Sequence, residues 1–431
     1  RPNRYANEGT ARNGEWDKII ELMNDFNNKF NIKHVLPKDI LKSKKNLYSD
    51  KKLKLESTEQ PVPVKKQEKY SLNRWALTGK NDLELNTNCH FIAKELKMND
   101  IDNDPRWKEL CFLWSSDIRT HINNERYEKY NNRVNNLLST LQKRKYNLNF
   151  NINKIEFDNI DSDYKMEFNK TLVKSDHKYV YIENPEIILE LNKKRGLTVS
   201  RAIFKTTSEE SLFGTLNHGY YDQITLAADY YTGHAIIEKP GQHKITNLIE
   251  ICPKISIVDS SIIIHYTTII KDIKFSCIIN FNTYSNQISF YNKLNFPNRE
   301  IGIIRPMNFT FNPQAFDKGS LYYATNNGGE SIENFSLNSR YVRHSELLSN
   351  LVSAKYGIGC SEGLMIIGDK NKQVKIQHQN SVSALVPSIN FQSLDNSQFF
   401  LRLQYSAQEM DETFIERNGE YIINSSFKVY V

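Results

Sequence analysis

The spacing of apolar side chains changes twice along the 431 residues and divides the chain into three regions. Residues 14–30 carry apolar side chains three and four positions apart, which predicts an amphipathic helix. This stripe consists of Trp16, Ile19, Ile20, Leu22, Met23 and Phe26. Residues 32–36 then predict a short strand, and residues 37–41 another turn of helix. These elements are too few for a domain, so we expect residues 1–43 to be the end of an α/β unit.

A second helical pattern occupies residues 71–147. Three segments have helical periodicity, at residues 86–96, 105–123 and 125–143. Pro105 suits a first helical turn, with Asp104 before it as the cap. In the third segment the apolar stripe consists of Tyr127, Tyr130, Val134, Leu137, Leu138 and Leu141. The pattern predicts a small three-helix domain.

From about residue 148 to residue 431 the pattern is that of strands. Runs of β-branched and aromatic residues alternate with turns rich in Asn, Gly, Asp and Pro. The clearest runs are NLNFNINKIEF, KYVYIEN, IILELN, ISIVDSSIIIHYTTIIK, KFSCIINFNT, QISFYNKLNF and FFLRLQYSA. We predict a large antiparallel β-sandwich, or two packed sheets, because no helical interval interrupts the runs. A propeller is disfavoured, since no repeat of 40–45 residues is visible.

Composition and charge narrow the class of protein. With 39% hydrophobic residues the chain can bury several cores, and no run of 18 apolar residues indicates a membrane span. The net charge of +7 lies in residues 1–75, which hold 17 Lys+Arg against 10 Asp+Glu; the other residues balance at 40 against 40. Many of these charges fall in residues 44–70 together with Pro, Ser and Gln. That composition indicates a solvated linker. Because the basic residues then do not lie on a folded face, we do not expect nucleic-acid binding.

The five cysteines are widely spaced and odd in number, without a CxxC pair. This arrangement argues against a zinc knuckle and a disulfide framework, and indicates a reducing compartment, which we expect to be cytoplasmic. No cofactor is expected. Residue 1 is Arg, so we expect the chain to be part of a longer protein.

The densest group of polar and aromatic residues lies at 214–248. Within it His218, Tyr220, Tyr221 and Asp222 form a candidate saccharide-binding segment. Aromatic faces stack on sugar rings, while carboxylates, amides and imidazoles bind the hydroxyls. The alternative is structural, because aromatics commonly fill the space between sheets and glycines mark turns.

A second candidate is the turn around Asn327, where the backbone amides of an Asn-Gly-Gly sequence can approach a ligand. Glu330 and Glu333 follow, and paired carboxylates can serve as general acid and base. On an exposed loop such a pair is more often only solvated.

Two further groups could have either a functional or a structural role. Asp117 and His121 are spaced to share a helix face, where they could position a substrate or hold two helices together. Near the start of the chain, Glu8 and Arg12 precede the first helix, where loops of an α/β barrel line its active face.

Several segments together resemble the C-terminal part of bacterial enzymes related to glycoside hydrolase family 57 and to the family 38 mannosidases. The resemblance rests on RYANEGTARNGEW and HVLPKDIL, on NRWALTGKNDLELNTNCHFIAKEL and ELCFLWSSDIRTHI, and on RGLTVSRAIF, GTLNHGYYDQITLAADYYTGHAIIEKPGQHKITNL and FFLRLQYSAQEMDET. It implies the end of an incomplete (β/α)7 barrel, then a helical domain, then a supersandwich of the galactose-mutarotase type. The catalytic carboxylates of those enzymes lie on earlier barrel strands, so the resemblance assigns no catalytic residue here.

The resemblance implies a glycoside hydrolase or glucanotransferase acting on α-linked oligo- or polysaccharides, of which this chain supplies scaffold and part of the substrate cleft. Two alternatives stay open. One is a polysaccharide deacetylase-like or lyase enzyme, whose metal ligands would also lie outside the chain. The other is a non-catalytic protein that binds saccharides or assembles surface polysaccharides.

Overall fold

The computed structural model describes residues 14–31, 35–36, 39, 77, 79–98, 105–115, 122–141, 155–216, 230–326, 332–337, 358–394, 398–410, 414 and 416–431. The chain divides into two compact units, Arg1–Ser57 and Thr58–Val431. Within the described ranges, no helix combines the length and apolar character needed to span a membrane. The basic segment predicted as a linker, residues 44–70, lies outside the described residues.

The first unit contains the predicted amphipathic helix, α1 (Glu15–Phe30). Gly14 and Asn31 bound it, and both adopt the left-handed backbone conformation. The apolar stripe of α1 is exposed. Val35 and Leu36, the two described residues of the strand predicted at 32–36, are not in a strand, and a barrel is not shown.

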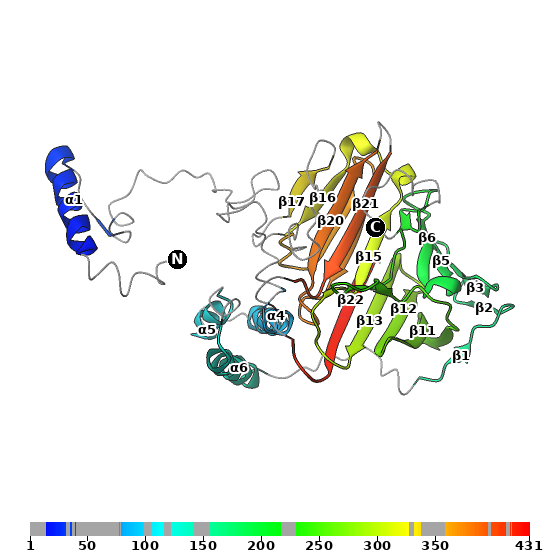
Figure 1. The fold of residues 1–431 in the computed structure, drawn as a ribbon. Helices are drawn as coiled ribbons and strands as arrows, with labels where there is room; N and C mark the ends of the chain where they lie inside the picture. Colours follow the sequence, from blue (N-terminus) through cyan, green and yellow to red (C-terminus); the bar gives the residue numbers. More distant parts are fainter. Residues whose placement is uncertain are drawn as a thin grey trace. The chain divides into compact units, whose positions relative to one another are not determined.

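The second unit begins with the helical block, α4 (Asp82–Met98), α5 (Pro105–Leu113) and α6 (Asn124–Ser139) (Figure 1). The three predicted helices are therefore present, but the second ends ten residues earlier than predicted. Asn123 is not part of the second helix because it caps α6, where its side-chain oxygen accepts a hydrogen bond of 2.8 Å from the Arg126 backbone N–H. The helices share a core that includes Cys89, Ile92 and Val134.

The strands described in the rest of the second unit form antiparallel sheets, which confirms the predicted class of the C-terminal region. In the described ranges the larger sheet has ten strands in the order β1 (Asp158–Asn159), β10 (Lys254–Val258), β11 (Ser261–Ile270), β12 (Ile273–Asn282), β13 (Gln287–Phe296), β22 (Tyr421–Tyr430), β19 (Gln373–His378), β18 (Leu364–Gly368), β16 (Tyr322–Thr325) and β17 (Glu333–Ser336). The second has nine, in the order β2 (Lys165–Phe168), β3 (Thr171–Ser175), β4 (Tyr179–Glu183), β5 (Ile187–Asn192), β6 (Thr198–Phe204), β7 (Phe213–Gly214), β15 (Met307–Phe311), β21 (Phe399–Ser406) and β20 (Val386–Ser393). A small sheet has the order β14 (Ile303–Arg305), β8 (Ile236–Glu238) and β9 (Ile245–Thr246). Short 3₁₀ helices are η4 (Lys193–Arg195), η6 (Pro313–Ala315) and η7 (Lys318–Ser320).

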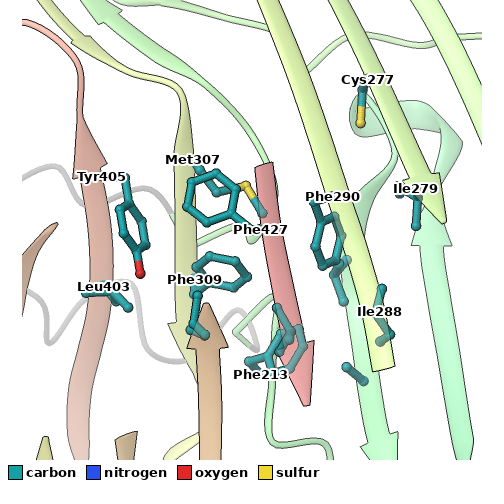
Figure 2. Packing of buried hydrophobic residues seen from close by; sticks show 14 of the residues in the cluster. Phe213, Cys277, Ile279, Ile288, Phe290, Met307, Phe309, Leu403, Tyr405 and Phe427 are labelled. Carbon is teal, nitrogen blue, oxygen red and sulfur yellow. The ribbon is translucent and has the colours of Figure 1, made fainter. Parts of the chain in front are cut away.

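One apolar core joins the two large sheets. Phe309 of β15 lies at its centre, with its ring centroid 5.9 Å from that of Phe427 and 6.1 Å from that of Phe290, both in the ten-stranded sheet. Tyr405 of β21 lies 4.7 Å from Phe427 (Figure 2). These edge-to-face contacts cross from one sheet to the other, so the inner faces interdigitate as in a sandwich.

The helical block packs against the sandwich within the same unit. Leu77 and Leu83 belong to the apolar core of the β-sheets. The Arg299 guanidinium donates a hydrogen bond of 2.9 Å to the Gly79 carbonyl, and the Ala384 backbone N–H donates one of 2.9 Å to the Thr87 hydroxyl. Polar and apolar contacts therefore hold the helices on the sandwich.

Candidate functional site: a buried polar face of the nine-stranded sheet

The residues that the sequence singled out for substrate binding lie outside the described residues. They are His218, Tyr220, Tyr221, Asp222, Asn327, Glu330, Glu8 and Arg12, and the same holds for Asp117 and His121. Glu333 is described and pairs with Thr325 as the first residue of β17. The described neighbours of these segments form the candidate site.

The two described residues that flank the segment with His218 and Asp222 lie next to each other. Leu216 precedes the segment and Tyr230 follows it, and the Leu216 backbone N–H donates a hydrogen bond of 3.2 Å to the Tyr230 carbonyl. Leu216 and Phe400 of β21 form a small apolar cluster, and the Tyr230 side chain packs against this cluster. The two ends of this segment thus lie together on the nine-stranded sheet.

Strand pairing fixes which other side chains share that face with Phe400. Gln404 of β21 lies opposite Asn308 on one side and Ser388 on the other. Two residues along, Arg402 lies opposite Thr310 and Asn390. Paired residues point to the same side of a sheet and successive residues alternate, so these side chains and Phe400 occupy one face. We call Asn308, Thr310, Ser388, Asn390, Arg402 and Gln404 the polar row.

The other face of these three strands is the apolar core. There Phe309 pairs with Leu403, and both side chains lie in the core (Figure 2). Leu403 in turn pairs with Ile389. The strict alternation predicts that the polar row faces solvent. Instead its members are buried: Gln404 is 2% exposed and Arg402 7% exposed. Burial of a polar side chain is unfavourable unless the side chain is hydrogen-bonded. The buried side chains of the polar row therefore need hydrogen-bond partners within the protein.

Hydrogen bonds connect the deeper half of the polar row. The Gln404 side-chain amide donates to the Asn308 side-chain oxygen over 3.0 Å, and the Asn308 amide donates to the His234 carbonyl over 3.0 Å. The Thr310 backbone N–H donates to the Thr232 hydroxyl over 2.8 Å. Thr232 and His234 come from the predicted segment 214–248, so its described part anchors β15.

The shallower half of the row lies toward the edge strand β20. Here Gln392, which pairs with Phe400, is half-buried, and Leu394 packs on Phe400. The Arg402 guanidinium carbon lies 5.8 Å from the centre of the Phe400 ring. This end of the face combines a guanidinium, an amide and aromatic or apolar surface, which are the groups that bind hydroxyls and sugar rings.

A charged cluster extends the row at its other end. Ser406 follows Gln404 on the same face and donates a hydrogen bond of 2.7 Å to Glu409. The Arg305 guanidinium lies 3.6 Å from Glu409 and 3.7 Å from Glu238. Burial raises the pKa of Glu409, while the charge of Arg305 opposes that shift. Glu409 can therefore hold a proton at a higher pH than an exposed carboxyl group.

The chemistry available at this face is hydrogen bonding and proton binding. Within the described ranges, no group of three His, Cys, Asp or Glu side chains is arranged to hold a metal ion. All five cysteines are free thiols. Sequence reasoning treated FFLRLQYSA only as a strand and missed Arg402 and Glu409. The polar residues alternating within that run were the available signal.

Comparison with known proteins gives distant structural similarity. No protein-family model matches the chain, and no curated protein matches it in sequence. Among solved structures, the 4-α-glucanotransferase from Thermococcus litoralis is 8% identical, with a TM-score of 0.30 over 81% of this chain and 50% of that protein. The chain thus spans half the length of that protein.

Two other similar structures match a smaller share of this chain. A galactose mutarotase related enzyme from Lactobacillus acidophilus is 9% identical, with a TM-score of 0.33 over 58% of this chain and 96% of that one. The α-galactosidase from Lactobacillus brevis is 7% identical, with a TM-score of 0.33 over 62% of this chain and 39% of that one. The similarity of this chain to all three structures is distant.

Proposed function

We propose that this chain is the C-terminal portion of a carbohydrate-active enzyme, a glycoside hydrolase or glucanotransferase acting on α-linked saccharides, and that the shallower half of the polar row, toward the edge strand β20, forms part of its saccharide-binding surface. The supporting observation is the collection of hydrogen-bonding side chains from three adjacent strands on one face beside Phe400 and Tyr230. A saccharide needs such a surface, because its hydroxyls both donate and accept hydrogen bonds and its ring faces are apolar.

In this proposal the segment with His218, Tyr220, Tyr221 and Asp222 also contacts the saccharide. Its support is that both flanking residues, Leu216 and Tyr230, pack beside the polar row. The carboxylates that cleave or transfer the glycosidic bond belong to a barrel domain outside these 431 residues. The purified chain alone should therefore not turn over aryl glycosides.

Calorimetric titration of the chain with maltohexaose, preceded by a screen of α-linked gluco-, galacto- and manno-oligosaccharides, tests the binding surface. Asn390→Ala removes an amide at the shallower end of the row and should weaken binding about fivefold, the equivalent of about 1 kcal/mol for one hydrogen bond. Asn424→Ala is the matched control, since Asn424 is an exposed strand residue of the ten-stranded sheet. Equal affinities for the two variants would contradict the assignment of this face.

The predicted segment is tested in the same way within the full-length enzyme. Tyr220→Ala or Asp222→Ala should weaken substrate binding by a factor of roughly 5 to 150, with the melting temperature nearly unchanged. If both substitutions mainly lower the melting temperature, the residues serve the fold. Turnover of an aryl glycoside by the 431-residue chain would show that the catalytic carboxylates lie within it.

A further inference from the structure

A second polar hollow lies where the helical block meets the sandwich. One part of it has a volume of about 420 Å³ and is lined by α6 together with Arg417 and Asn418. The other part has a volume of about 90 Å³ and lies between α4 and α6. Tyr127 and Asn131 line both parts, so the two parts are adjacent. We call this hollow the amide groove; it shares no residue with the polar row.

The groove has a regular wall. Asn124, Glu128, Asn131 and Asn135 of α6 are four, three and four residues apart, so they form one stripe along the helix. Asn88 of α4 lines the smaller part and Asn418 lines the larger part. Tyr127 and Val134 of α6, which belong to the core of the helical block, contribute apolar surface to the lining. Five side-chain amides from three separate segments therefore line the two parts together.

The cations at the groove already have partners. The Arg417 guanidinium carbon lies 4.8 Å from the centre of the Tyr127 ring, and the Lys80 ammonium lies 5.6 Å from it. The Lys80 ammonium also donates a hydrogen bond to the Asn124 side-chain oxygen. The lining itself holds two acidic residues, Glu84 and Glu128, and one basic residue, Arg417. The groove thus presents amides and a slight excess of negative charge, which does not suit a phosphate or a polyanion.

We propose that the amide groove is a binding site for a neutral oligosaccharide, distinct from the polar row; the ligand class rests on the proposed function. A side-chain amide both donates and accepts, so neighbouring amides can bind neighbouring hydroxyls of a sugar. The volume of the larger part falls in the range of roughly 300–1,000 Å³ that small-molecule sites occupy. The groove would hold either part of a long saccharide or a second, separate saccharide.

Titration of the whole chain with maltohexaose tests this proposal with variants of one helix. Asn131→Ala combined with Asn135→Ala removes two amides of the groove. Asn132→Ala combined with Asn136→Ala is the matched control, because both residues are exposed on α6 outside the groove. Alanine favours a helix more than asparagine does, so neither pair should unfold α6.

The wild-type chain should show two classes of site. The groove variant should weaken one class about thirtyfold, since each lost amide corresponds to about 1 kcal/mol, and leave the other unchanged. The control should match the wild type, and Asn390→Ala should affect only the other class.

The possible failures are distinguishable. If Asn390→Ala weakens binding while the groove variant matches its control, the groove proposal is wrong and the proposed function stands. If the groove bound a polyanion such as heparin, with an affinity that fell steeply as the NaCl concentration rose, the groove proposal would also be wrong. If the wild-type chain binds neither maltohexaose nor any member of the α-linked array, both proposals are contradicted.

Discussion

Acidification should destabilise this protein through one buried imidazole, that of His378 at the end of β19. Its ring centroid lies 5.4 Å from that of Tyr405 and 5.2 Å from that of Phe427, and the residue is 1% exposed. Burial and, to a lesser degree, the charge of His90 lower the pKa of His378 to about 3, against weaker opposing hydrogen bonds from Ser383 and Asn380. The folded state therefore keeps this imidazole neutral.

The sign and size of the effect follow from proton binding. In the unfolded chain a histidine has its ordinary pKa of 6.5. Between that value and about 3, the unfolded state binds more protons than the folded state, so the free energy of unfolding falls as the pH falls. Each pKa unit of difference corresponds to about 1.4 kcal/mol, so at about pH 5 this residue should lower stability by about 2 kcal/mol relative to neutral pH.

Urea unfolding of the wild type and of His378→Phe, at neutral pH and at about pH 5, measures how much His378 contributes to the loss of unfolding free energy on acidification. The phenyl ring keeps an aromatic between Tyr405 and Phe427 and cannot be protonated, so the variant should lose about 2 kcal/mol less on acidification. If phenylalanine prevents folding, His378→Leu serves instead. His177→Gln is the control, since His177 is exposed, and it should behave as the wild type. If the His378 variant loses as much stability as the wild type, the imidazole is not the acid-sensitive group.

Phe309→Ala should lower the free energy of unfolding by about 3–5 kcal/mol in urea titrations, because it opens a cavity between the two sheets; a loss below about 1 kcal/mol would mean that the core is not shared. Arg299→Ala should cost about 3 kcal/mol, because it leaves the Gly79 carbonyl and the Gln408 side-chain oxygen without their charged donor. Its control, Arg133→Ala, breaks an exposed pair with Glu109 and should cost under about 1 kcal/mol; equal losses would show that Arg299 does not fasten the helical block. Limited proteolysis should cut first within residues 44–70, whose Lys-rich composition cannot offset the entropy of ordering. A first cut within 200–300 would mean that the domain bounds are misplaced.

Much of the β-region could be predicted from local sequence alone. The run at residues 255–271 forms the hairpin of β10 and β11, with Asp259 in the left-handed conformation at its turn. Period-two alternation and turn residues are sufficient to predict such a hairpin, because its two strands are adjacent in the chain. The predicted end of the second helix, at residue 123, was wrong. Helical periodicity extends through Asn123, but Asn123 caps the next helix, and this capping role is a competing local signal.

The polar row could not be predicted in the same way. Alternation within β21 shows that Arg402 and Gln404 share a face, but their neighbours come from β15, about a hundred residues earlier in the sequence. Single-sequence periodicity carries no information on which distant strands pair. The sequence also suggests that such a face is solvated, whereas Gln404 is buried and bonded to Asn308. The Asn stripe of α6 was visible in the sequence, but its convergence with Arg417 depends on the packing of two separate regions.

The central claim, that the shallower half of the polar row is part of a saccharide-binding surface, is tested most directly by a crystal structure of the chain in complex with the tightest-binding member of the α-linked array. The account predicts electron density for a sugar whose hydroxyls lie within hydrogen-bonding distance of Arg402 or Asn390, with a ring face against the aromatic surface beside Phe400. Density for the bound sugar elsewhere on the sandwich, with the polar row unchanged and uncontacted, would contradict it.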